Sequence, residues 1–359
     1  MKPRVLVAMS GGVDSAVAAA RLLDEGYEVV GVTLHLWDYP DADEGGHGRC
    51  CAPEDQYDAR RTADALGFPH YTFDRRALFA ETVVAPFVDA YLRGETPSPC
   101  ATCNRGVKLR ELFALADRLG AAHVATGHYA RIVTGTDGPR LAQGRDLTKD
   151  QSYFLYATPP DQLARLLFPV GASTKAEVRA EAITRRLPGA EKGESQELCF
   201  VGTKPHAYAA FVEARAEGRV RPGAIVDGSG RVVGEHAGIH RFTVGQRKGI
   251  GVAAARPVYV TRIDAETGDV HLGEDDALLA SRAAIDDVVL APGATVPRRA
   301  RVRVRYRHDG VLGELLAGEG GTVEVRFDEP VRAVTRGQVA VFYDRDEVLG
   351  GGRIANASA

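Results

Sequence analysis

The sequence lacks the features of a membrane protein, a secreted protein or a strongly charged nucleic-acid binder. Its 359 residues include no apolar run of membrane-spanning length. Residues 1–4 lead directly into a strand-like segment, without the apolar region and cleavage site of a secretory signal, so we expect a cytoplasmic protein with no membrane association. The net charge of −3 excludes a general attraction to nucleic acid, so RNA binding would require a local basic patch.

Cysteine is also scarce, with only five residues in the chain. In a cytoplasmic protein this number argues against a disulfide framework and favours ligands, catalysts or inert core residues. Two metal sites remain open as alternatives. Cys50, Cys51, Cys100 and Cys103 could hold zinc, although adjacent cysteines are an uncommon ligand pair. An iron–sulfur cluster on Cys100, Cys103 and Cys199 is the less favoured alternative.

The most informative segment that is present is Ser10–Ser15, which reads Ser-Gly-Gly-Val-Asp-Ser. It lies between an apolar strand-like run, Val5–Ala8, and a helical pattern. The glycines allow a tight turn, and the N–H groups at the helix start attract a phosphate. No Lys followed by Ser or Thr comes after the glycines, which excludes a Walker P-loop. The form resembles the loop of ATP pyrophosphatases, with a glycine turn and capping serines as the alternative.

The organisation of the chain changes after about residue 205. Before it, strand-like and helix-like segments alternate, which predicts an α/β domain with a mostly parallel sheet over residues 1–205. After it, glycine and short alternating runs predict two small β modules, over residues 206–278 and 279–355, the last a β-barrel. We expect residues 356–359 to be a frayed end.

Chemistry-bearing residues fall at the ends of the expected strands and helices. Ser10, Leu34 and Gly127 follow three strands of the expected parallel sheet, and ligands gather at that edge. A helix is expected over residues 107–119. The segment Cys100–Asn104 precedes it, so a thiol would lie near a helix N-terminus, where the thiolate is favoured.

A candidate basic patch lies in residues 298–307, where arginine alternates with other residues. On a strand, the alternation would place the arginines on one face and the apolar residues on the other. Such a face can bind phosphates, and a solvated edge strand protected by charge is the alternative. The basic face would carry Arg301, Arg303, Arg305 and Arg307, and the apolar face Val302, Val304 and Tyr306.

Several motifs along the whole chain resemble a single family, the MnmA family of bacterial tRNA-specific 2-thiouridylases. One such motif could arise by chance, but this many in the family's order could not. The resemblance implies an N-terminal domain of the adenine nucleotide alpha-hydrolase-like, ATP pyrophosphatase type. The motifs are Ser10–Ser15, Thr96–Pro99 leading into Cys103, Gly127–Ala130, Lys149–Phe154, Ser195–Phe200, Phe242–Gly249 and Gly337–Gln338.

The resemblance also implies roles for individual residues. Cys103 matches the family's nucleophile and Cys199 the cysteine that carries a persulfide, and the two can end the reaction as a disulfide. Many members have Asp where this chain has Cys100, which leaves the acid–base group unassigned. The implied ATP-binding residues are Ala8, Met9, Ser10, Gly11, Gly12, Val13, Asp14, Ser15, Leu34 and Gly127. The implied tRNA-binding residues are His128, Lys149, Asp150, Gln151, Arg305, Tyr306 and Gln338.

The reaction that the resemblance implies has two stages. ATP adenylates the C2 oxygen of the wobble uridine in the tRNA anticodon loop, and persulfide sulfur then replaces AMP. ATP and Mg²⁺, with Asp14 a candidate magnesium ligand, are the implied cofactors, and a cysteine desulfurase or sulfur-relay protein is the implied donor. Three other interpretations remain: an amidotransferase-type synthetase, an iron–sulfur-dependent thiolase, and a non-enzymatic nucleotide-sensing RNA-binding module.

Overall fold

The computed structural model describes residues 2–38, 53–135, 137–190, 192, 198–202, 207–253 and 256–358. Its N-terminal part is built on a five-stranded sheet in the order β3-β2-β1-β4-β7, with every pair parallel. The strand β1 is fully buried at its centre because Val5, Leu6 and Val7 have no polar side chain to solvate. The strands are β1 (Arg4–Ala8), β2 (Glu28–His35), β3 (His70–Asp74), β4 (His123–Ala125) and β7 (Leu166–Leu167).

Helices cover this sheet, as the alternating pattern predicts. The helix expected over residues 107–119 begins earlier than expected, at Pro99, because proline is favoured in the first turn of a helix. It continues through a π-helical turn, Asn104–Lys108, into α6. The helices are α1 (Val13–Asp24), α2 (Pro53–Leu66), α3 (Arg76–Phe79), α4 (Ala85–Leu92), α5 (Pro99–Cys103), α6 (Leu109–Arg118), α7 (Ser152–Leu155), α8 (Pro160–Leu163), α9 (Lys175–Thr184) and α10 (Ala207–Glu213), with a second π-helical turn at Ala80–Val84.

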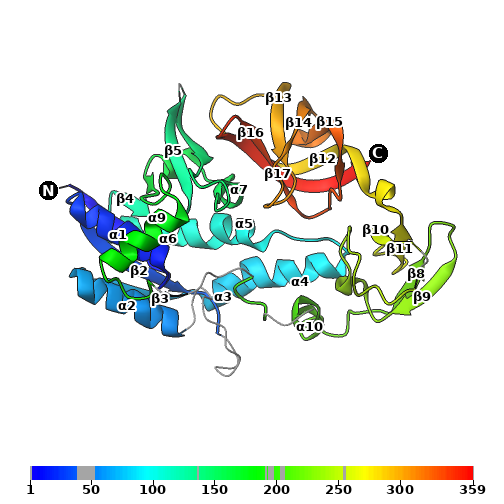
Figure 1. Ribbon diagram of the computed structural model, residues 1–359, viewed down its shortest axis with the longest axis horizontal. Coiled ribbons are helices and arrows are strands. Elements are labelled where there is room, and N and C mark those ends of the chain that lie inside the picture. The colour runs from blue at the N-terminus through cyan, green and yellow to red at the C-terminus, as the bar shows by residue number, and fades with distance from the viewer. Residues whose placement is uncertain are drawn as a thin grey trace.

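The second half is mainly β, as expected, and forms two modules (Figure 1). The first is a four-stranded sheet in the order β10-β11-β8-β9. The second is a barrel of six strands in the order β12-β15-β14-β13-β16-β17, closed by pairing of β12 with β17. The strands are β8 (Gly223–Val226), β9 (Val232–His236), β10 (Tyr259–Ile263), β11 (Val270–Gly273), β12 (Leu279–Leu290), β13 (Arg298–Arg303), β14 (Val311–Ala317), β15 (Val323–Arg332), β16 (Val339–Asp344) and β17 (Glu347–Ser358).

A hairpin from the N-terminal half joins the barrel's sheet. It consists of β5 (Ala130–Gly135) and β6 (Gly138–Gln143) and follows β4 directly in the chain. The hairpin joins the barrel where Ala142 of β6 pairs with Glu347 at the start of β17. In Figure 1 the hairpin stands beside the barrel, and α4 and α5 run beneath both. The end of β4, where a ligand site was expected, is therefore physically connected to the barrel.

Two expectations about the barrel were wrong. The strand β13 ends at Arg303, so Arg305 and Arg307 lie in the turn that follows and not on a continuous basic face. Arg303 is itself buried, because it pairs with a buried carboxylate. The chain end is not frayed either, since residues 356–358 pair with residues 282–284 and complete the barrel closure. No helix in the described part of the chain is long and apolar enough to cross a membrane.

Candidate active site

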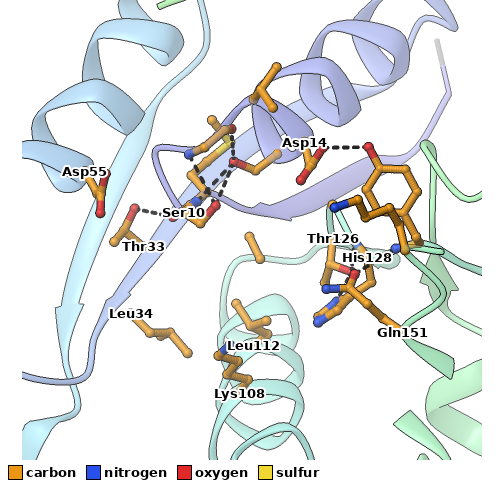
Figure 2. A pocket seen from close by; sticks show the side chains of 18 of the residues that line it. Ser10, Asp14, Thr33, Leu34, Asp55, Lys108, Leu112, Thr126, His128 and Gln151 are labelled. Atoms are coloured by element: carbon orange, nitrogen blue, oxygen red, sulfur yellow. Dashed lines mark hydrogen bonds between the residues drawn. The ribbon is translucent and has the colours of Figure 1, made fainter. Parts of the chain in front are cut away.

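A cavity of about 440 Å³ lies at the carboxyl ends of β1, β2 and β4. Figure 2 shows the Ser10 loop along one side and Leu34 and Leu112 on the opposite side, with His128 and Gln151 at one end. The structure brings most of the expected site residues to this one cavity, although they come from segments far apart in the sequence. They are Ala8, Met9, Ser10, Gly12, Val13, Asp14, Ser15, Leu34, Gly127, His128, Lys149, Gln151 and Tyr306.

Hydrogen bonds within the loop fix its turn. The Ser15 hydroxyl donates to the Gly12 carbonyl (2.9 Å) and accepts from the Ser10 N–H (3.2 Å). Gly11 has a φ of +75°, and a Cβ there would lie 2.1 Å from the Asp55 carbonyl oxygen of α2. A Cβ on Gly127 would lie 2.8 Å from backbone atoms of Asp14 and Ser15. Both glycines therefore allow neighbouring segments to approach the loop closely, although Gly11 does not line the cavity itself.

A lysine that the sequence analysis missed neutralises the aspartate of the loop. The Lys175 ammonium lies 2.7 Å from both carboxylate oxygens of Asp14, and the Tyr129 hydroxyl donates to the same carboxylate at 2.7 Å. Lys175 opens α9, whose start is fixed by a reciprocal capping box between Thr174 and Glu177. The capping box could be found in the sequence, but nothing in the sequence indicates that this helix start meets Asp14.

Further cations line the same side of the cavity. Lys192 bonds to Asp55 at 3.1 Å and also to Asp58, and Arg179 follows Lys175 by one helical turn. Burial opposes the charge on Lys192, but its bonds to Asp58 and Asp55 outweigh burial and raise its pKa. Lys175, Arg179 and Lys192 together offset the three carboxylates Asp14, Asp55 and Asp58, so the Ser10–Ser15 loop does not face a polyphosphate with net negative charge.

His128 is neutral at physiological pH. Burial, with a further contribution from Lys108, lowers its pKa to about 3. Its Nδ1 lies 2.8 Å from the Thr126 hydroxyl. The imidazole is thus a hydrogen-bonding and stacking group in this cavity and not a cation for phosphate binding.

This burial predicts a pH dependence of stability. The unfolded chain takes up a proton on this imidazole near pH 6.5, whereas the folded protein does not until about pH 3. Protons therefore favour the unfolded chain in this window, and the stability is lost as the pH falls below about 6.5. We expect the melting temperature to fall between pH 7 and pH 5, and to fall less steeply in His128→Gln. Identical pH dependence in the variant would contradict this assignment.

The three described cysteines, Cys100, Cys103 and Cys199, lie outside the cavity lining. Cys100 is exposed in the first turn of α5, so one thiol lies near a helix N-terminus as expected, whereas Cys103 is buried further along the same helical stretch. Cys199 is half-buried and packs against the same apolar cluster that contains Cys103. Arg105, two residues after Cys103, pairs with Asp287 of the barrel at 2.6 Å.

The helix that carries Cys103 also reaches the cavity. Lys108, which ends the π-helical turn that follows Cys103, lines the cavity. Tyr306, which lines the cavity, interacts electrostatically with Cys100. Burial raises the pKa of Tyr306, and the nearby Asp150 and Cys100 raise it further. The cysteines are therefore neighbours of the cavity and not part of its wall.

Three residues expected to contact RNA make hydrogen bonds within the protein. Asp150 is 1% exposed and accepts hydrogen bonds only from protein groups, so its side chain is not placed to touch RNA. Gln338 donates to the carbonyls of Thr96 (3.0 Å) and Pro97 (3.1 Å), and so holds the loop that leads into α5. Arg305 lies outside the cavity lining and donates to the Arg332 carbonyl at 3.0 Å.

The described residues contain no group of three or more His, Cys, Asp or Glu side chains arranged to hold a metal. Cys100, Cys103 and Cys199 are all described, so the structure does not gather them into a site for a cluster. Cys50 and Cys51, half of the alternative zinc site, lie outside the described residues. The two aspartates in the cavity, Asp14 and Asp55, are each bonded to a lysine and do not fit a magnesium site formed by the protein alone.

Comparison with known proteins decides the family. Family models match three consecutive segments: a "tRNA methyl transferase HUP domain" over residues 3–203, a "tRNA methyl transferase PRC-barrel domain" over 210–274 and an "aminomethyltransferase beta-barrel domain" over 286–354. A tRNA-specific 2-thiouridylase MnmA of Sorangium cellulosum is 63% identical over 359 residues, covering 99% of this chain and 92% of the relative. The chain belongs to the MnmA family of tRNA-specific 2-thiouridylases.

Other relatives agree. The MnmA of Geobacter metallireducens is 46% identical over 358 residues, covering 98% of this chain and 97% of the relative. Among solved structures, a 4-thiouridine synthetase in complex with RNA and ATP matches 60% of this chain and 51% of its own, at 15% identity and a TM-score of 0.35. That structural likeness is too slight to carry an inference, so the assignment to the MnmA family rests on sequence.

Proposed function

We propose that this chain catalyses the ATP-dependent 2-thiolation of the wobble uridine of tRNA, as a cytoplasmic enzyme. One observation carries the proposal: the cavity joins a phosphate-binding loop with its lysines to Tyr306 and Arg307 of the barrel. A nucleotide and a nucleobase would therefore meet in one cavity. The thiols that would supply and accept sulfur lie on the helix that forms one wall and in the adjacent segment.

In the first stage, the C2 oxygen of uridine attacks the α-phosphorus of ATP and the bond to pyrophosphate breaks. The backbone N–H groups of Ser10–Ser15 face the phosphates, and Lys175 and Lys192 offset the charges of Asp14 and Asp55, so these carboxylates do not repel the departing pyrophosphate. Neither Asp14 nor Asp55 is placed to hold Mg²⁺, because both are paired with lysines; Mg²⁺ bound to ATP would neutralise part of the phosphate charge. Leu34 and Leu112 offer an apolar surface to the adenine.

In the second stage, the terminal sulfur of a persulfide on Cys199 attacks C2 of the uridine and AMP leaves. The Cys103 thiolate then attacks the inner sulfur of Cys199, which frees the thiolated base and leaves a Cys103–Cys199 disulfide. A dithiol reductant and a sulfur donor, a cysteine desulfurase or sulfur-relay protein, complete the cycle. In this chain Cys100 occupies a position where an acid is common in the family, so the thiol of Cys100 is available as a second resolving group.

The test is to incubate the purified protein with unmodified tRNA, ATP, Mg²⁺, cysteine and a cysteine desulfurase. The proposal expects 2-thiouridine by nucleoside mass spectrometry, with AMP and pyrophosphate formed only when tRNA is present. Two of the matching family models are described as domains of a tRNA methyl transferase, so the control replaces ATP and the sulfur-donor system with S-adenosylmethionine. A methylated base under those conditions, or pyrophosphate release with ammonia incorporation, would replace this proposal with another.

A second test addresses the RNA-binding side. Arg307 is exposed, lines the cavity and lies beside Tyr306, so we expect it to contact a phosphate of the anticodon loop. Arg307→Ala should weaken tRNA binding several-fold and reduce the slope of log affinity against log salt by about one. Arg305→Ala, implied by the family motif, should act in the same direction.

The matched control for these variants is Arg299→Ala. Arg299 is an exposed arginine of the same barrel, pairs with Asp328 and lies away from the cavity. Its removal should leave the affinity and the salt slope unchanged. Equal effects of Arg299→Ala and Arg307→Ala would mean that the barrel attracts RNA only through its overall charge.

A further inference from the structure

Asp150 is among the most deeply buried charged residues of the described chain and has a complete set of partners. One carboxylate oxygen accepts from the backbone N–H groups of Gly144 and Ser152, both at 3.1 Å. The other accepts from the Gln143 amide (3.0 Å), the Ser152 hydroxyl (3.1 Å) and the Arg303 guanidinium (2.7 Å). Its side chain thus has no polar capacity left for a ligand.

Each of the three guanidinium nitrogens of Arg303 also donates a hydrogen bond within the protein. Arg303 lies at the end of β13, is 6% exposed and directs the same guanidinium in two directions. One side bonds to Asp150, and the other donates to the carbonyl oxygens of Tyr306 and His308 (2.9 Å for His308) in the turn that follows β13. The ring of Tyr306 then packs on Phe154, with centroids 4.6 Å apart. This single side chain therefore shapes the turn that carries Tyr306 and Arg307.

The residues on either side of this ion pair in the chain form the rim of the cavity. We define the rim as Lys149, Gln151, Tyr306 and Arg307, all of which line the cavity. Lys149 and Gln151 flank Asp150, whereas Tyr306 and Arg307 belong to the turn held by Arg303. The two halves of the rim come from parts of the chain separated by about 150 residues. The Asp150–Arg303 pair is the buried ionic contact between them.

We propose that Asp150 and Arg303 are positioning residues for RNA binding: the pair holds the two halves of the rim at a fixed separation. This inference rests on the proposed function, because it takes the rim to be the surface that receives the tRNA. A positioning role explains why an acid lies in the middle of a segment otherwise suited to polyanions. Its negative charge is directed at Arg303 and is hidden from the phosphates that Lys149 would meet.

Removing Asp150 or Arg303 would have a structural effect that follows from their contacts. Removal of one partner leaves the other charge buried without compensation, which is strongly unfavourable, so the surrounding segment must rearrange. The rearrangement would begin at the turn of Tyr306 and Arg307, because Arg303 donates directly to its carbonyls. The Ser10–Ser15 loop is stabilised by its own hydrogen bonds and by Lys175, so it should change little.

The experiment is a double-mutant cycle with Asp150→Asn, Arg303→Gln and the double variant, which keeps hydrogen-bonding groups at both positions. Each variant is assayed for tRNA affinity, for ATP affinity and for the kcat and KM of thiolation. We expect each single variant to weaken tRNA binding about tenfold or more, with the change in KM for tRNA and not in the affinity for ATP. The double variant should be no weaker than the singles, because all three lack the same contact.

The control pair is Arg298 of β13 and Asp344 of β16, an ion pair at 3.0 Å that is more exposed than the Asp150–Arg303 pair and does not line the cavity. Arg298→Gln should leave tRNA affinity unchanged. Unchanged tRNA affinity in folded Asp150→Asn and Arg303→Gln, with only a lower melting temperature, would overturn the positioning role. So would losses that add in the double variant. Absence of tRNA binding or thiolation by the unmodified protein would instead refute the proposed function, which makes the two failures distinguishable.

Discussion

We expect the Cys199→Ser variant to form no detectable 2-thiouridine while it binds ATP and tRNA as tightly as the unmodified protein. The serine hydroxyl cannot carry a persulfide, so the uridine would be activated without receiving sulfur. Cys199 is half-buried and outside the cavity lining, so its replacement by a side chain of similar size should leave the nucleotide site intact. Nucleoside mass spectrometry measures the product, and filter binding measures the two affinities.

The matched control is Cys100→Ser, which changes an exposed thiol three residues from Cys103. If Cys100 is only a second resolving group, this variant keeps thiolation and changes which disulfide accumulates after one turnover. Full thiolation by Cys199→Ser would rule out the persulfide on Cys199. Loss of tRNA binding in Cys199→Ser would mean that the residue acts through the fold and not through sulfur chemistry.

The second large effect is expected from Lys175→Met. Methionine keeps most of the length of the side chain but removes the ammonium that lies 2.7 Å from both oxygens of Asp14. The loop would then present an uncompensated carboxylate to the phosphates of ATP. Removal of a preorganised charge of this kind costs on the order of 10²–10³ in kcat. We expect a loss of this size in tRNA-dependent pyrophosphate release, accompanied by weaker ATP binding.

Two variants control for this result. Arg185→Met removes a cation at the C-terminal end of the same helix α9, where the arginine pairs with Asp24 and Glu181 at the surface. It should leave pyrophosphate release unchanged. Asp14→Asn combined with Lys175→Met should recover part of the ATP affinity, because the repulsive carboxylate is gone. Normal pyrophosphate release by Lys175→Met would show that the ion pair of this lysine with Asp14 is only structural.

Local patterns explain how much of the fold was predictable. The apolar run Val5–Ala8 and the helical spacing after Ser15 determine β1 and α1, and the alternating order of elements predicts the parallel sheet. Short-range features misled in two places. The alternation in residues 298–307 resembles a strand throughout, but the buried ion pair of Arg303 ends the strand and begins a turn. The small polar residues at the chain end gave no sign that they pair with β12.

The same distinction between local and long-range features applies to the residues of the candidate site. Ser10, Asp14 and Gly127 could be found from the sequence because they belong to short contiguous motifs or follow expected strands. Lys175 and Lys192 could not, since their importance lies in contacts with Asp14 and Asp55 across more than a hundred residues. Asp150 was expected to contact RNA because it lies within a motif, and only its burial revealed that it faces Arg303.

Three features could be read from the amino-acid sequence alone. They are the phosphate-binding turn, the thiols within motifs of the family, and the order of elements that predicts a parallel sheet followed by β modules. These are local properties, fixed by the backbone freedom of glycine, the reactivity of sulfur and the periodicity of apolar residues. The tertiary structure decided which charges meet. Ion pairs depend on distance in space and on burial, and neither can be read from the spacing of Asp14 and Lys175 or of Asp150 and Arg303 along the chain.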